Sequence, residues 1–471
     1  MDISILNILA IGAIFIPLIF ALYLITSRLN LSYVNKKVLN YGTSVVNFIS
    51  FAIFSTLYFL SNQGEILNFN FNFFSLEKFS LNFGLLINEN NIIFLIFASL
   101  LCLIVSLYSK FYFDKKKQFI FTKQRFYAFL SFLSFLGYIF LSSINLFQGT
   151  IILILQSIAV FVFSYFDIFK NPTNHNIVRF HRISHIGNFA LLCAVLMLFR
   201  YSILSQGYIS SNSLDYNELN VLVSYMYGIS SSIEFKLMTA CFIFAIMSRL
   251  MIFPLSCYYS FFANSSNVLY LAVSLCANNL MGIFLFLKVM PLLELSEKCV
   301  FYLEIFLVLA AILSFIQMFF EKNIKIFFGY LLSIINSSFI VLFLNFNTTI
   351  IKYCYFGINI LFAIILMHLF IKDKINFKKR IINRNLGFLL EKSHIVLFEI
   401  VPDKISKFVE IIDEKIIQNL ILIVFKTIDW FATLFVIKTT KNRLGDILRN
   451  ILISFALITI FAIFVALFWR L

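Results

Sequence analysis

The chain has 471 residues, of which 61% are hydrophobic and 13% are charged, and its mean hydropathy is +0.95. A water-soluble domain contains only about half apolar residues, so this composition excludes one and predicts an all-α polytopic membrane protein. The net charge of +15 does not indicate a nucleic-acid partner, because the lysines and arginines gather in short loops between apolar segments.

Apolar runs long enough to cross a membrane recur along the chain. A spanning helix needs about 20 apolar residues, and on this rule we predict about twelve spans. They cover residues 4–27, 40–61, 91–113, 124–147, 149–169, 181–204, 236–262, 266–290, 299–320, 324–346, 350–371 and 447–470. The first run follows Asp2 with no basic segment and no cleavage site, so we interpret it as a retained span and not as a signal peptide.

The connections between these runs are alternately basic and near-neutral. Lysines and arginines gather at residues 28–37, 110–123, 170–182, 322–325 and 372–380. Basic loops of membrane proteins stay on the cytoplasmic side. We therefore predict an integral multi-pass protein of a bacterial inner membrane, with its N-terminus outside.

The segment 373–446 differs from the transmembrane bundle predicted for residues 1–372. Charged residues interrupt it too often for a span, but apolar residues recur at helical spacing from Val409 to Ile428, which is typical of an amphipathic helix. We predict a basic loop and a long lateral helix on the membrane surface or on a partner, then a C-terminal transmembrane anchor over 447–471. Two short surface helices joined by a loop are the alternative.

Arg249 is the most informative residue, because it lies within the apolar run from Lys236 to Phe262. A charged side chain at membrane depth is unfavourable and indicates a functional site. Arginine remains protonated at physiological pH. It is therefore suited to holding an anion or a carboxylate, and poorly suited to releasing a proton in each cycle.

Other polar residues in the predicted spans could line an ion pathway. With Arg249, the candidates are Gln156, His185, Asn188, Ser274, Asn336 and, at the start of a span, Lys325. Asparagines in membrane helices also join helices by hydrogen bonds worth about 0.6 kcal/mol each, so a structural role is the alternative for Asn336. His181 and His185 have the spacing of a metal pair on one helix face, but a basic interfacial belt explains them better, and we predict no metal site.

A helix break is predicted near the end of the run that contains Arg249. Pro254 interrupts this run, and the polar residues Asn264, Ser265, Ser266 and Asn267 end it. A proline leaves backbone groups that need a cavity or water in the membrane, and broken helices of this kind mark transport sites. A simple hairpin between two spans is the alternative.

Five short patterns follow one another in an order that is found in one protein family. They lie at Leu107–Tyr112, Arg125–Leu130, Ile186–Leu192, Arg249–Leu255 and Asn323–Tyr330. In this order they resemble the antiporter-like membrane subunits of respiratory complex I, the subunit L or subunit 5 class of NADH-quinone oxidoreductase, which is related to Mrp antiporter subunits. The resemblance implies a non-catalytic subunit that binds no cofactor and has other membrane subunits and the lipid bilayer as partners.

The resemblance also implies a proton pathway, whose titratable groups are replaced in this chain. The family's glutamate on the fifth helix aligns with Gln156, its lysine on the broken seventh helix with Arg249, the aspartate of one motif with Asn188, and a histidine of the eighth helix with Ser274. The chain is also shorter than the class, and it leaves no room for the second broken helix.

We therefore predict a divergent, shortened subunit L-like protein of a complex I-type or Mrp-like assembly, whose proton or cation translocation is weakened or lost. Two alternatives remain. One is a membrane component of an inorganic-carbon or anion transport system, for which a fixed Arg249 charge is suitable. The other is a non-pumping structural paralogue.

Overall fold

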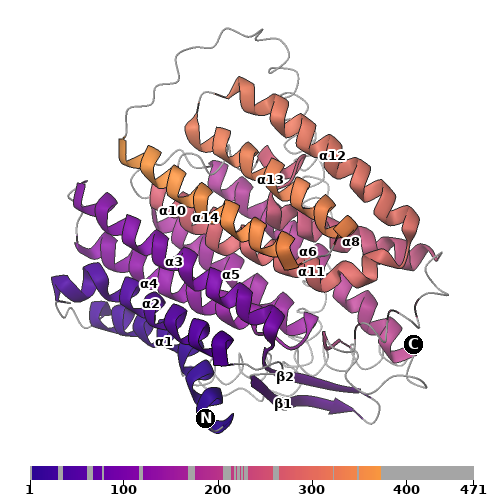
Figure 1. Ribbon diagram of the computed structural model, residues 1–471, viewed down its shortest axis with the longest axis horizontal. Helices are drawn as coiled ribbons and strands as arrows, with labels where there is room; N and C mark the ends of the chain where they lie inside the picture. The colour runs from indigo at the N-terminus through magenta and orange to yellow at the C-terminus, as the bar shows by residue number, and fades with distance from the viewer. Residues whose placement is uncertain are drawn as a thin grey trace, which may run out of the picture. The chain divides into compact units, whose positions relative to one another are not determined.

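The computed structural model describes residues 3–29, 35–60, 67–76, 79–115, 120–167, 175–204, 214–216, 219, 223, 226, 232–257, 265–321, 323–346 and 349–372. Helices make up most of this part of the chain (Figure 1). Before the helix break they are α1 (Ile3–Leu29), α2 (Lys36–Leu60), α3 (Glu89–Lys115), α4 (Ile120–Leu141), α5 (Leu146–Asp167), α6 (His175–Leu204) and α8 (Ile233–Leu250). After it come α10 (Asn267–Leu271), the π-helical segment Ala272–Asn279, α11 (Leu280–Glu294), α12 (Glu297–Phe320), α13 (Ile324–Phe346) and α14 (Thr349–Lys372).

Ten helices of the described residues are long and apolar enough to cross a membrane. They are α1 to α6, the continuous helix from Asn267 to Glu294, and α12 to α14. They match ten of the predicted spans and confirm an all-α polytopic membrane protein. The predicted span 447–470 and the predicted lateral helix within 373–446 lie outside the described residues and remain predictions.

The predicted span 236–262 is wrong as a continuous helix, because α8 ends at Leu250. Met251 takes a left-handed conformation with φ of 52°, and a short 3₁₀ turn follows at Leu255–Cys257. Pro254 follows a cis peptide bond in this turn. The helix therefore breaks before the proline.

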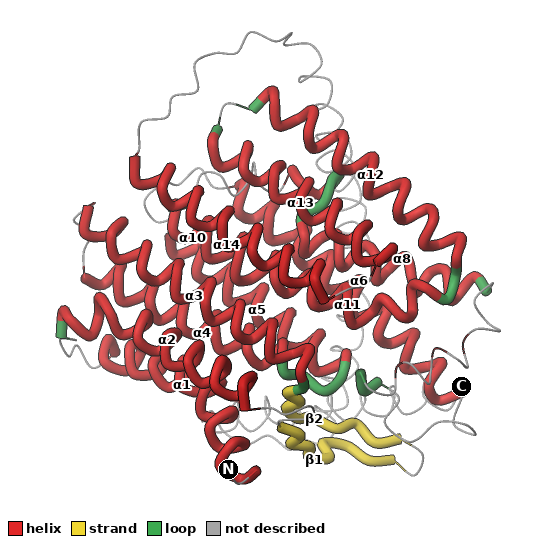
Figure 2. The backbone as a smooth tube through the Cα atoms, in the orientation of Figure 1, coloured by secondary structure: helices red, strands yellow, loops and turns green. Residues whose placement is uncertain are grey.

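The connection between α2 and α3 contains a β-hairpin that the sequence analysis missed. Strand β1 (Leu67–Leu76) pairs antiparallel with β2 (Phe79–Ile87), with a bulge at Asn72/Phe74, and both strands lie at one end of the helices (Figure 2). The alternation of Asn and Phe along β1 has the period of two that is typical of a strand.

Hydrogen bonds attach this hairpin to the loop between α4 and α5 and to the first turn of α5. The Leu86 amide donates to the Ser142 carbonyl at 2.7 Å. The Gln148 side chain accepts from the Gly84 amide at 3.2 Å and donates to the Gly84 carbonyl at 2.9 Å. We call this side of the bundle, with β1, β2 and residues 142–145 and 214–216, the hairpin end.

Small polar side chains join the first four helices. Ser106 on α3 donates to Ser44 on α2 at 2.9 Å, and Tyr138 on α4 donates to Asn47 on α2 at 3.1 Å. Gln124 on α4 donates to the Leu24 carbonyl of α1 at 2.8 Å. Inside a membrane the hydrophobic effect does not drive helices together, because the lipid tails are as apolar as the helix surfaces. Close packing and hydrogen bonds of this kind therefore hold the helices together.

Two glycines allow the end of α8 to lie close to its neighbours. A Cβ at Gly187 of α6 would lie 1.8 Å from Ser248 Oγ, and one at Gly282 of α11 would lie 2.6 Å from Leu250 Cδ2 and 3.3 Å from Arg249 Cβ. Such distances exclude any larger residue without a shift of the helices. The glycines therefore place Arg249 between α6 and α11.

Gly187→Ala should lower the thermal unfolding midpoint of the protein in detergent. The added methyl group overlaps Ser248, and overpacking of a tight contact costs about 1–3 kcal/mol. Gly357→Ala on α14 is the matched control, because its added Cβ meets nothing within 4 Å and alanine stabilises a helix relative to glycine by about 0.5–1 kcal/mol. Equal midpoints for the two variants would contradict the close approach of α6 and α8.

Candidate functional site

The candidate site is formed around Arg249, in the last turn of α8. The residue is only 4% exposed, although a guanidinium is among the most unfavourable groups to bury. It lies where α8 packs on α6 and α11. Its environment must therefore supply hydrogen-bond acceptors.

These acceptors come from α5 and α6. The Arg249 Nη2 atom donates to the Leu153 carbonyl at 2.7 Å, to Ser157 Oγ at 3.0 Å and to Asn188 Oδ1 at 2.5 Å. The Nη1 atom lies 3.5 Å from Gln156 Oε1. The structure thus brings together three residues that the sequence analysis selected, Gln156, Asn188 and Arg249, and adds Leu153 and Ser157, which it missed.

The four acceptors are all uncharged. Asn188 Nδ2 in turn donates to Ser157 Oγ at 2.8 Å, so Asn188 and Ser157 fix each other beside the guanidinium. Gln156 Nε2 is buried and has no hydrogen-bond partner among the described residues. A charged group can be held by oriented neutral dipoles when each is hydrogen-bonded, and this cluster provides such an environment.

Histidines extend the site along α6. The rings of His181 and His185 lie 3.9 Å apart, and their Nε2 atoms are in contact. His181 also stacks on Phe161 of α5 at 3.9 Å. His185 lies three residues before Asn188 on α6, and so on the same side of this helix as that acceptor. Within the described residues no group of three or more possible ligands could hold a metal ion.

A second buried network of hydrogen bonds provides a donor to a backbone carbonyl at the C-terminal end of α8. Asn336 Nδ2 on α13 donates to the Leu250 carbonyl at 3.0 Å. The Tyr355 hydroxyl of α14 lies 3.1 Å from Asn336 Oδ1 and 2.9 Å from Asn279 Oδ1, and Asn279 Nδ2 donates to Asn359 Oδ1. Because Leu250 follows Arg249 directly, this network and the guanidinium cluster meet at the helix break.

The sequence analysis selected Asn336 but missed Tyr355 and Asn359. Both lie on α14, one helical turn apart, in a run that is otherwise apolar, and this spacing was the available signal. Asn279 ends the π-helical segment, a form that occurs mostly at functional sites. Ser274 lies in the same segment but bonds only to the Tyr270 carbonyl of its own helix, at 2.7 Å, among the contacts that the structure describes.

Lys325 lies away from Arg249. It is at the start of α13, and its ammonium donates to the Ser265 carbonyl. Asn336, which contacts the end of α8, is eleven residues further along the same helix, or about 16 Å. Lys325 therefore belongs to the basic end of the bundle and not to the cluster around Arg249.

The polar residues after the break start a helix. Ser266 accepts a hydrogen bond from the Leu269 amide at 3.4 Å and caps α10, which begins at Asn267. Ser265 is buried. Asn264 lies outside the described residues. Ser265, Ser266 and Asn267 thus form the entry to the next span, as in the hairpin alternative.

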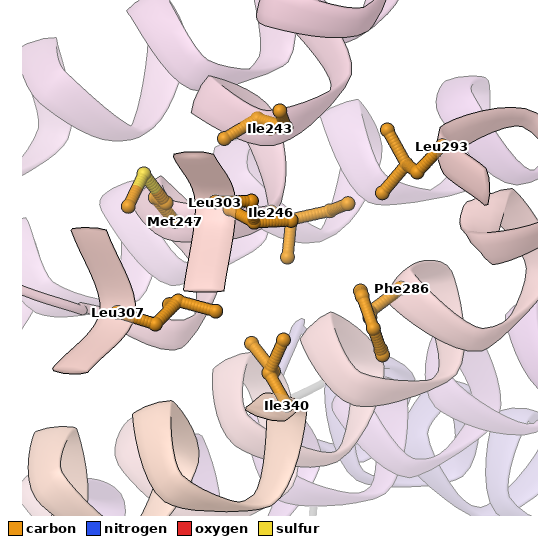
Figure 3. A pocket seen from close by; sticks show the side chains of 8 residues that line it. All are labelled: Ile243, Ile246, Met247, Phe286, Leu293, Leu303, Leu307 and Ile340. Atoms are coloured by element: carbon orange, nitrogen blue, oxygen red, sulfur yellow. The ribbon is translucent and has the colours of Figure 1, made fainter. Parts of the chain in front are cut away.

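A small pocket lies between α8, α11, α12 and α13 (Figure 3). Its lining is entirely apolar: Ile243, Ile246, Met247, Phe286, Leu293, Leu303, Leu307 and Ile340. Such a lining offers no hydrogen-bond donor or acceptor to an ion. The polar clusters, and not this pocket, are therefore the candidate pathway.

Comparison with known proteins supports the fold. No protein-family model and no curated protein matches the sequence. One similar solved structure is that of the membrane-bound sulfane sulfur reductase, an archaeal respiratory membrane complex. The match has a TM-score of 0.58 and 14% identity, and covers 75% of this chain and 55% of that chain. The chain thus spans about half the length of a protein whose membrane fold it shares.

Fold and site together define an integral membrane protein in which the polar groups of the candidate site are one cation and neutral hydrogen-bonding side chains. The cation lies at a helix break, and its acceptors come from the two preceding spans. An arrangement of this kind holds positive charge in place. None of its four acceptors is a carboxylate, so none of them is a group that takes up and releases protons.

Asn188→Leu should lower the thermal unfolding midpoint. It removes the acceptor nearest to the guanidinium, and a hydrogen bond to a charged group contributes about 1.5–3 kcal/mol. Asn188→Asp, which keeps an acceptor and adds a negative charge, should retain the midpoint. Asn345→Leu, on an exposed part of α13, is the control. If Asn188→Leu unfolds at the same temperature as this control, Arg249 does not depend on Asn188.

Proposed function

We propose that the chain is a subunit L-like membrane subunit of a multi-subunit complex of the respiratory or Mrp antiporter type, and that its proton translocation is lost. The observation that carries the proposal is the Arg249 guanidinium bonded to the amide oxygens of Gln156 and Asn188. These are the positions at which the resembling family has acids. The fold shared with a chain of a respiratory membrane complex supports membrane subunits as partners.

The physical argument is that a proton pathway needs groups that gain and lose protons near neutral pH. Amides do not titrate, and arginine remains charged. The Gln156–Arg249 pair therefore acts as a fixed electrostatic element that joins α5 to α8. In this proposal the chain binds no redox cofactor, and the segment 373–446 contacts neighbouring membrane subunits.

The proposal predicts that the tagged chain, extracted in a mild detergent, co-purifies with other multi-pass membrane subunits. The measurement is identification of these subunits by mass spectrometry. The control is the Gly357→Ala variant carried through the same steps, since its added Cβ meets nothing within 4 Å and assembly should be unchanged. Recovery of the chain alone, folded and monodisperse, would overturn the assignment to a complex.

A second candidate function is transport of an anion, and one observation favours it. Among the buried side chains that the structure describes, Arg249 and Lys123 are charged, and no aspartate or glutamate is buried. Lys123 pairs with Asp114 at 2.9 Å at one end of the bundle. The charge buried in the interior of the described part is therefore positive, which attracts an anion and repels a proton or a metal cation.

Reconstituted vesicles distinguish the two functions. If the site is a fixed structural element, neither proton uptake nor bicarbonate uptake should change between the wild type and Arg249→Ala. If the chain carries anions, Arg249→Ala should reduce bicarbonate uptake at least about tenfold, since a buried charge contact is worth more than about 1.4 kcal/mol. Proton uptake that depends on Arg249 would contradict both.

A further inference from the structure

Two lysines that neither function uses lie together at the hairpin end of the bundle. Lys288 is on α11 and Lys352 is on α14, and both side chains are half-buried. The Lys288 Nζ atom lies 4.8 Å from the ring centre of Tyr216 and 5.1 Å from that of Phe284. Lys352 Nζ lies 3.4 Å from Asn90 Oδ1. Phe94 of α3 packs on Phe284, one turn before Lys288, and on Phe356, one turn after Lys352, with ring centres 5.2 Å and 4.9 Å apart, which places both lysines on the hairpin side of the same aromatic cluster.

Within the part of the chain that the structure describes, neither ammonium group has a neutralising carboxylate. No aspartate or glutamate of the described residues forms an ion pair with Lys288 or Lys352. Glu89 and Glu294, at the ends of α3 and α11, are exposed, and Asp215, next to Tyr216, is half-buried and forms a backbone bridge with Asn145. Two like charges that share a partly dehydrated site repel each other, and an anion between them removes that repulsion.

The remaining hydrogen-bond donors indicate the chemistry of the anion. Each ammonium group has three N–H donors, and Asn90 Oδ1 accepts one of them. The faces of Tyr216 and Phe284 attract the Lys288 cation but offer no oxygen. An oxyanion, which presents several acceptor atoms in different directions, can bond to both lysines at once.

We propose that Lys288 and Lys352 bind a small oxyanion that enters from the aqueous phase at the hairpin end. The binding site is formed by α3, α11, α14 and residue Tyr216 of the segment 214–216. It is separate from the Arg249 cluster, so it does not depend on the proposed function. Asn90 orients Lys352, and the two aromatic rings orient Lys288.

Thermal unfolding of the full-length protein in neutral-lipid nanodiscs tests this site. The midpoint is followed with a thiol-reactive dye, which reports exposure of buried cysteines such as Cys102 and Cys276. Sodium bicarbonate is titrated against sodium gluconate at constant sodium concentration and pH. The wild type should show a saturable rise in the midpoint. Lys288→Gln and Lys352→Gln should each raise the half-saturating concentration at least about tenfold, the loss expected for a charge-assisted hydrogen bond.

The controls separate binding from folding. Lys298→Gln removes an exposed lysine at the start of α12 and should leave the titration unchanged, and Lys288→Arg, which keeps the charge, should retain a saturable response. Without bicarbonate, Lys288→Gln and Lys352→Gln should each still give one cooperative unfolding transition, which shows that the variants are folded. The proposal is overturned if the wild type shows no saturable response, or if all variants respond equally.

Discussion

A guanidinium inside an apolar bundle must have acceptors from more than one helix, and this requirement determines how α5, α6 and α8 meet. Arg249 obtains a backbone carbonyl and two side-chain oxygens from α5 and an amide oxygen from α6. Gly187 and Gly282 then become necessary, since only glycine lets α8 approach closely enough on both sides. The glycine contacts, the end of α8 and the position of Asn188 all follow from satisfying one buried charge.

The sequence predicted the spans better than the connections between them. Spans are predictable because the membrane imposes one length and one polarity on each helix. Gln156, Asn188 and Arg249 were predicted as candidates for an ion pathway; the structure brings their side chains together, and the pathway itself remains a prediction. The acceptors at Leu153 and Ser157 could not be predicted, because a backbone carbonyl leaves no mark in the sequence and serine is common in these helices.

Two features were wrong or missed for physical reasons. Hydropathy alone extended α8 through residue 262, but the chain leaves the helix at Met251, where the left-handed residue and the Asn336 bond to Leu250 satisfy the helix end. The hairpin of β1 and β2 was missed because its alternating Asn and Phe residues lack the long apolar run that identifies a span. The predicted lateral helix and final anchor, within 373–446 and 447–471, remain predictions.

The hydroxyl of Tyr355 has one hydrogen, yet it lies within bonding distance of two amide oxygens, those of Asn279 and Asn336. It can donate to only one of them at a time. Rotation of a single O–H bond therefore exchanges which of the two asparagines is satisfied, without moving any heavy atom. The junction of α13, α14 and the π-helical segment thus has two alternative hydrogen-bond arrangements, and a ligand or neighbour that bonds to either amide oxygen favours one of them.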